Sequence, residues 1–170
     1  GDGTTLFIDP YVGLGDPPRT LRMIPVPFDP EDVADADAVL ATHEHTDHVH
    51  GPSQAPILET TGAPLYAPDD SLDVALDDED WQADYDIADD QFVEVAEGDE
   101  FEVGEVSVTV EVAQDADATH PVSYVIEYEG TTFFHGGDTK PSDEFERVGT
   151  EYDIDVGVLA FGTVGNVDAK

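Results

Sequence analysis

Three histidines and an aspartate lie within six consecutive residues of this 170-residue chain, which has only six histidines in all. The segment is His43-Glu44-His45-Thr46-Asp47-His48. His43 and His45 are two residues apart, so an extended backbone can direct both rings to one side, where they can bind one cation. Imidazole and carboxylate ligands suit Zn²⁺, Mn²⁺ or Fe²⁺, and no cysteine is present to offer a thiolate. The segment therefore predicts a divalent metal site, with Asp47 and His48 at a neighbouring position; the alternative is a polar loop of hydrogen-bonded histidines.

A buried strand must position this segment. Residues 37–42 read Asp-Ala-Val-Leu-Ala-Thr, a short apolar run with small and β-branched members. The metal segment then lies on the loop that leaves the carboxyl end of the strand, where α/β sheets usually place their ligand sites.

The pattern His-x-His-x-Asp-His after a strand ending in Ala-Thr resembles the signature of the metallo-β-lactamase-fold hydrolases. Flavodiiron oxidoreductases on the same fold usually have glutamate at the position of His45, so this residue favours hydrolysis. The run from Arg22 to Pro30, together with residues 37–43, is similar to the branch that contains L-ascorbate-6-phosphate lactonase. The resemblance implies a layered α/β fold, an αββα sandwich, in a single domain over residues 1–170 that is incomplete at both ends.

Two further ligands are expected from distant parts of the chain. Asp138 follows a predicted strand and two glycines, which let the backbone approach metal ions closely. The resemblance places Asp138 as a carboxylate that bridges two cations, and it places the third histidine of the family in the region of His120. Asp115 and Asp117 lie near His120 and could serve instead, and His120 could also be a plain surface residue.

Supporting and substrate-binding residues are also implied. In the resembled family an aspartate that ends the first strand orients the metal loop through hydrogen bonds, a role that fits Asp9, with Thr42 in the same supporting position. The alternative for Asp9 is an ordinary turn residue before proline. Arg22, in an irregular loop over 11–30, is a candidate to bind a substrate phosphate or carboxylate. Its alternative is a pairing with a surface carboxylate.

These assignments predict a metal-dependent hydrolase with two divalent ions, zinc or manganese being favoured. The ligands form three groups: His43, His45 and His120 for one ion, Asp47 and His48 for the other, and a bridging Asp138. A metal-activated hydroxide would attack an ester or lactone carbonyl, with Asp47 and Asp138 as catalytic carboxylates and Asp47 passing a proton to the leaving alkoxide. A phosphodiesterase on the same site remains an alternative. A non-catalytic metal-binding module is a further alternative, because no histidine follows His135 in the sequence. His135 itself is expected only to pack or to form hydrogen bonds.

The composition bounds the possible partners and surroundings. With 41 acidic and 5 basic residues the net charge is −36, which disfavours nucleic acid and anionic membranes as partners and leaves a small-molecule substrate. The 39% hydrophobic content argues against disorder, so the acids are expected to cover a folded domain adapted to high salt, from a halophilic source. No apolar run reaches membrane-spanning length and no signal peptide is visible, so we expect a cytoplasmic location. The abrupt start and the end at Lys170 suggest a segment of a larger hydrolase.

Periodicity and turn residues predict the remaining elements. Helices are expected over 51–61, with Gly62 as the stop, and from 69 through 76. A hairpin turn is expected at Glu129-Gly130. The predicted strands cover residues 4–8, 64–67, 92–95, 101–103, 106–112, 122–128, 131–134 and 156–161, the last of them buried.

Overall fold

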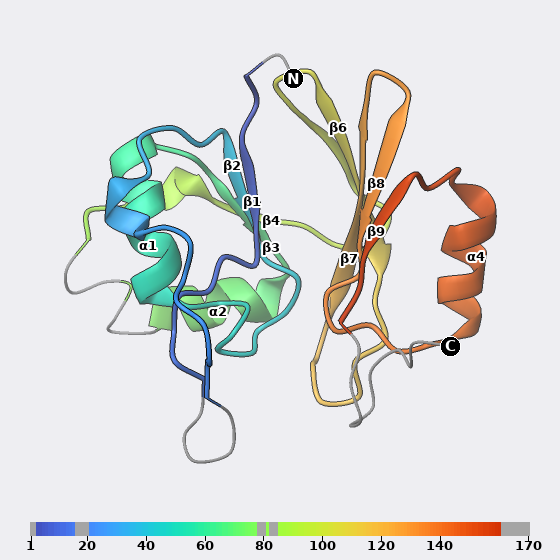
Figure 1. Ribbon diagram of the computed structural model, residues 1–170, viewed down its shortest axis with the longest axis horizontal. Helices are drawn as coiled ribbons and strands as arrows, with labels where there is room; N and C mark the ends of the chain where they lie inside the picture. The colour runs from blue at the N-terminus through green and yellow to red at the C-terminus, as the bar shows by residue number, and fades with distance from the viewer. Residues whose placement is uncertain (1–2, 16–20, 78–80, 82–84, 161–170) are drawn as a thin grey trace.

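Two β-sheets pack against each other, and helices cover the outer face of each (Figure 1). The computed structural model describes residues 3–15, 21–77, 81 and 85–160. Helices α1 (Gly51–Thr61) and α2 (Asp69–Asp77) lie outside the first sheet, and α4 (Asp143–Glu151) lies outside the second. The predicted fold class, a layered αββα sandwich, is confirmed.

The first sheet is parallel and has the strand order β1-β2-β3-β4. Its strands are β1 (Leu6–Ile8), β2 (Ala38–Leu40), β3 (Leu65–Ala67) and β4 (Phe92–Glu94). Strand β2 is fully buried because both of its faces are covered: Val39 packs in the cluster with α1 and α2, while Ala38 and Leu40 pack against the second sheet. The continuous apolar run of the sequence is explained by this double burial.

The second sheet has the order β5-β6-β7-β8-β9 and is antiparallel except between β8 and β9. Its strands are β5 (Glu100–Val103), β6 (Val106–Val112), β7 (Val122–Tyr128), β8 (Thr131–His135) and β9 (Val156–Val158). The predicted hairpin between β7 and β8 is confirmed, with φ of 47° at Glu129 and 79° at Gly130. Helix α4 makes the crossover that the parallel β8–β9 pairing requires.

Strand β9 differs from the expectation of a buried strand. Val156 and Val158 are 49% and 45% exposed. The strand is at the edge of its sheet, and among the described strands it pairs with β8 alone. The apolar composition of the strand therefore did not indicate its burial, and Phe161 lies outside the described residues.

The helix boundaries follow from local capping. Helix α1 ends where Gly62 takes a left-handed conformation with φ of 71°, as the sequence predicts. The segment after Asp29 forms a short 3-10 helix, η1 (Pro30–Asp32), whose N-terminus is capped because the Asp29 side chain accepts from the main-chain amide of Glu31. Over the described ranges, no helix is both long and apolar enough to cross a bilayer.

Candidate metal centre

Three loops converge where the parallel strands β1 and β2 end beside the second sheet. Asp9 follows β1, the histidine segment 42–48 follows β2, and Asp138 lies three residues beyond β8. The main chain joins these parts, because Asp9 N donates to Leu40 O at 2.9 Å and Val122 N donates to Thr42 O at 2.9 Å. The segment is thus held at the edge where both sheets meet.

Asp9 organises the segment through hydrogen bonds. Its carboxylate accepts from Thr42 N, from Thr42 Oγ1 and from His48 Nδ1, each at 2.8 Å. Asp9 itself has φ of 45°, an uncommon conformation outside glycine that costs free energy and is tolerated best by aspartate and asparagine. These contacts are what the predicted supporting role of Asp9 and Thr42 requires, and they are more than an ordinary turn residue makes.

The hydrogen bonds assign the tautomers of the three histidines. A carboxylate only accepts, so His48 carries its proton on Nδ1. Thr42 Oγ1 donates its one proton to Asp9 and therefore accepts from His43 Nδ1 at 3.0 Å. His45 Nε2 lies 3.3 Å from the carbonyl of Asp117, which again only accepts. In its neutral form each ring has one lone pair, on His43 Nε2, His45 Nδ1 and His48 Nε2.

These lone pairs lie where a cation would satisfy them. His43 Nε2 and His45 Nδ1 are 2.9 Å apart, and two lone pairs at that distance repel unless a positive charge lies between them. Asp115 Oδ2 is 3.8 Å from the first nitrogen and 3.7 Å from the second. His48 Nε2 lies 3.6 Å from Asp138 and 3.7 Å from Asp47. The donor set therefore fits divalent ions with nitrogen and oxygen ligands.

The pKa values agree with this distribution of charge. Burial, together with the nearby rings of His48 and His45, lowers the pKa of His43 to about 4, so a proton does not fill the gap at neutral pH. Burial alone would lower the pKa of His48, but the hydrogen bond to Asp9 and the surrounding carboxylates raise it on balance. Burial raises the pKa of the Asp138 carboxyl. The carboxylates around the rings thus favour a positive charge at the site, and a bound cation could supply it without a proton on His43.

Two groups of ligand atoms result, each within 4.8 Å, and both include His43: one with His45 and Asp115, the other with His48 and Asp138. Asp47 stands beside the second group with its side chain 61% exposed. The structure brings all of these predicted residues together, and their role as ligands stays a prediction. Asp115, which the sequence offered only as an alternative, takes a place at the site.

His120 is not in this cluster, contrary to the sequence-based expectation. Its Nδ1 lies 2.9 Å from Asp69 and 2.6 Å from Asp70 at the start of α2, and its side chain is 62% exposed. The hydrogen bond to Asp69 raises the pKa of His120 and lowers that of Asp69. The physical reason is competition: in a chain so rich in carboxylates, an exposed imidazole is attracted to the nearest acidic pair.

Asp115 is held at the site by a basic residue that sequence patterns did not single out. Lys140 Nζ contacts Asp115 Oδ1 at 3.1 Å, and Lys140 N donates to Gln114 O at 2.9 Å. Burial would raise the pKa of Asp115, but Lys140 lowers it on balance. Lys140 therefore keeps Asp115 ionised and directs the second oxygen, Oδ2, to the histidines.

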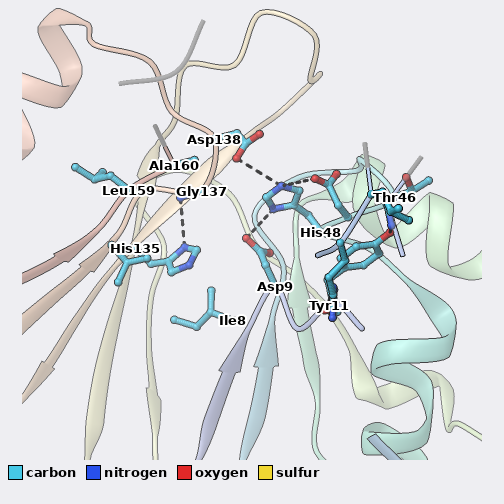
Figure 2. Close-up of a pocket in the computed structure, with 15 residues that line it drawn as sticks. Ile8, Asp9, Tyr11, Thr46, His48, His135, Gly137, Asp138, Leu159 and Ala160 are labelled. Atoms are coloured by element: carbon cyan, nitrogen blue, oxygen red, sulfur yellow. Dashed lines mark hydrogen bonds and ion pairs between the residues drawn. The ribbon is translucent and has the colours of Figure 1, made fainter. Parts of the chain in front are cut away.

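A pocket of about 740 Å³ opens beside the second group (Figure 2). His48, Asp47 and Asp138 line it at one side, and Arg22 lies in its wall. Arg22 Nη2 donates to Tyr11 O at 2.6 Å, and its guanidinium lies 5.4 Å from the centre of the Tyr11 ring. Among the described residues no carboxylate forms an ion pair with Arg22, so the alternative of a surface ion pair is not seen there.

Gly137 gives a first test of how tightly the site is built. It has φ of 53°, and a Cβ at this position would lie 2.9 Å from Thr42 Oγ1. We expect Gly137→Ala to destabilise the fold by about 2–3 kcal/mol in urea unfolding, and to weaken metal binding because Thr42 must move away from Asp9 and His43.

The matched control is Gly130→Ala. Gly130 also has a positive φ, 79°, but nothing lies within 4 Å of the position that a Cβ would take there, so only the backbone cost remains. Equal metal affinity in the two variants would contradict the proposed packing of Gly137 against Thr42.

The chain matches a known protein family over nearly its whole length. A model of the beta-lactamase superfamily domain matches residues 4–166. The probable L-ascorbate-6-phosphate lactonase of Escherichia fergusonii is 25% identical over 163 residues, which cover 84% of this chain and 44% of that protein. The chain thus spans less than half the length of this curated relative.

Two solved structures share the fold. Igni18, a metallo hydrolase from Ignicoccus hospitalis, superimposes with a TM-score of 0.70 at 22% identity, and the match covers 99% of this chain and 67% of that one. Isothiocyanate hydrolase from Delia radicum gut bacteria gives a TM-score of 0.67 at 21% identity, with 98% and 69% covered. These similarities concern the fold.

Proposed function

Because the chain belongs to the beta-lactamase superfamily, we propose that it is the metal-binding part of a hydrolase that opens a lactone or ester carrying an anionic group. The observation that carries this proposal is the set of imidazole lone pairs on His43, His45 and His48, directed at carboxylates beside a pocket. The similarity to a lactonase supports the choice of substrate class.

The residues would hold one or two divalent ions, with zinc or manganese as the favoured metals. His43, His45 and Asp115 form one donor group, and His43, His48 and Asp138, with Asp47 nearby, form the other. A cation bound here supplies Lewis acidity, which polarises a carbonyl oxygen and lowers the pKa of water. Asp9 and Thr42 fix the ring orientations, which matters for affinity nearly as much as the ligands do.

The other residues of the pocket suggest how a substrate is handled. In the reaction water adds to the acyl carbon, the acyl C–O bond breaks, and the alkoxide leaving group needs a proton. Asp47 is 61% exposed beside His48, so it can take a proton from the attacking water and pass it to the leaving oxygen. Arg22 offers a guanidinium, held by Tyr11, to an anionic group at the far end of the substrate.

Arg22 provides a test of the substrate class. We expect Arg22→Gln to lower kcat/KM by about 10- to 100-fold for lactones that carry a phosphate or carboxylate, because a charge-assisted hydrogen bond is lost. Neutral lactones should be hydrolysed at an unchanged rate, which serves as the internal control. An equal loss on charged and neutral lactones would show that Arg22 acts on the fold and not on the anion.

The function itself is tested with the protein loaded with Zn²⁺ or Mn²⁺ against a panel of lactones, aryl esters and phosphodiesters. We expect turnover of lactones that chelators abolish and metal restores. Turnover confined to phosphodiesters would replace this proposal by the phosphodiesterase alternative. Stoichiometric metal with no turnover of any substrate would favour a non-catalytic metal-binding module.

A further inference from the structure

His135 faces the pocket as the last residue of β8. On β8 it lies on the same face as Phe133, which packs between the two sheets, whereas Phe134 lies on the opposite face. Figure 2 shows the ring of His135 across the pocket from His48, near Ile8 and Asp9.

One hydrogen bond determines which ring nitrogen of His135 carries the proton. The main-chain N–H of Gly137 donates to His135 Nδ1 at 3.3 Å. An N–H group can only donate, so Nδ1 must be the unprotonated nitrogen and the neutral ring carries its proton on Nε2. Burial lowers the pKa of His135, so the ring is neutral near pH 7.

His135 is therefore opposite in character to the histidines of the metal centre. His43 and His48 use Nδ1–H for structural hydrogen bonds and leave a lone pair on Nε2. His135 accepts at Nδ1 and leaves an N–H donor on Nε2, which a cation would repel. Within the described residues no group accepts from this Nε2, and the nearby Asp9 carboxylate is already occupied by Thr42 and His48.

We propose that His135 is a substrate-binding residue whose Nε2–H donates a hydrogen bond to an acceptor oxygen of the substrate, on the side of the pocket opposite His48. This inference rests on the proposed function, since it takes the pocket to bind an oxygen-rich lactone or hydroxy acid. The pocket selects an acceptor at this position, because a hydroxyl or amine hydrogen directed there would oppose the N–H. Gly137 fixes the tautomer and so makes the ring a dedicated donor.

Two variants separate the donor from the bulk of the ring. His135→Gln places an amide N–H near the position of Nε2, whereas His135→Phe keeps a ring of similar size without a donor. In the metal-loaded protein we expect kcat/KM for γ-butyrolactone to fall about 10- to 100-fold in the Phe variant, and to stay within about threefold of wild type in the Gln variant. Metal content should be unchanged in both.

Two readouts do not depend on turnover. In the first, nitrogen NMR of the wild-type protein should show that His135 is protonated on Nε2. The second is binding of 4-hydroxybutyrate, the hydroxy acid formed from γ-butyrolactone. The Phe variant should bind it at least about tenfold more weakly than the wild type and the Gln variant do. If 4-hydroxybutyrate binds with these relative affinities but no protein hydrolyses a lactone, the proposed reaction is rejected and the binding role of His135 is still supported. The inference is overturned by a proton on Nδ1, by equal behaviour of all three proteins, or by a wild type that does not bind 4-hydroxybutyrate.

Discussion

Replacing His43 by Ala is expected to remove bound metal from the candidate site. His43 belongs to both groups, its Nε2 is 2.9 Å from His45 Nδ1, and its side chain is 1% exposed, so no other described residue can take its place without rearrangement. We expect metal content after dialysis to fall to the background level and lactone turnover to fall by more than about 100-fold, beyond the loss typical of a supporting residue. Elemental analysis and turnover are measured on the same sample.

Two further variants make this result interpretable. His43→Gln keeps polar volume in the buried position and should lose metal as His43→Ala does, which separates ligation from cavity formation. Asp73→Ala removes an exposed carboxylate from α2, distant in sequence from the site, and should leave metal content unchanged. Retention of a full complement of metal in both His43 variants would refute the site.

The second large effect concerns salt. The net charge is −36, and the excess carboxylates repel one another most strongly in the compact folded state. Salt screens this repulsion, because the Debye length falls from about 30 Å at 0.01 M to about 3 Å at 1 M. Few basic side chains offset this charge: in the described part of the chain, the Lys and Arg residues paired with carboxylates are Lys140 and Arg147. We therefore expect the midpoint of thermal unfolding to rise by about 10 °C or more between these salt concentrations, which corresponds to about 3–5 kcal/mol.

Sucrose at equal osmolarity provides the control for this experiment, because it strengthens burial without screening charge. Its effect should be clearly smaller than that of NaCl. An unfolding midpoint that is independent of NaCl would argue against charge repulsion as a determinant of stability and would remove the physical basis for expecting a halophilic source.

Much of the fold could be predicted because its signals are local. Gly62 ends α1 where the left-handed conformation is needed, and Glu129-Gly130 makes the hairpin between β7 and β8. The exposure of β9 could not be predicted, because an apolar strand has the same sequence pattern at the edge of a sheet as in its interior. Burial of a strand depends on which elements cover it, and that information is not in the strand.

The candidate site could likewise be predicted where its residues are close in sequence, but not where distant parts of the chain decide the contacts. The segment from His43 to His48 is local, and its position after a buried strand determines where its rings lie. His120 and Asp115 lie on one loop, and the choice between them depends on competitors from elsewhere, namely Asp70 and its neighbour at the start of α2 and Lys140 after β8. No spacing rule in the sequence reports such long-range competition.

The convergence of these imidazoles on divalent ions is tested most directly by anomalous diffraction from crystals grown with Zn²⁺. We predict an anomalous peak bounded by His43 Nε2, His45 Nδ1 and a carboxylate oxygen, or by the corresponding atoms around His48 and Asp138. Anomalous density confined to surface carboxylates, with these rings still hydrogen-bonded only to each other, would contradict a metal centre at this site.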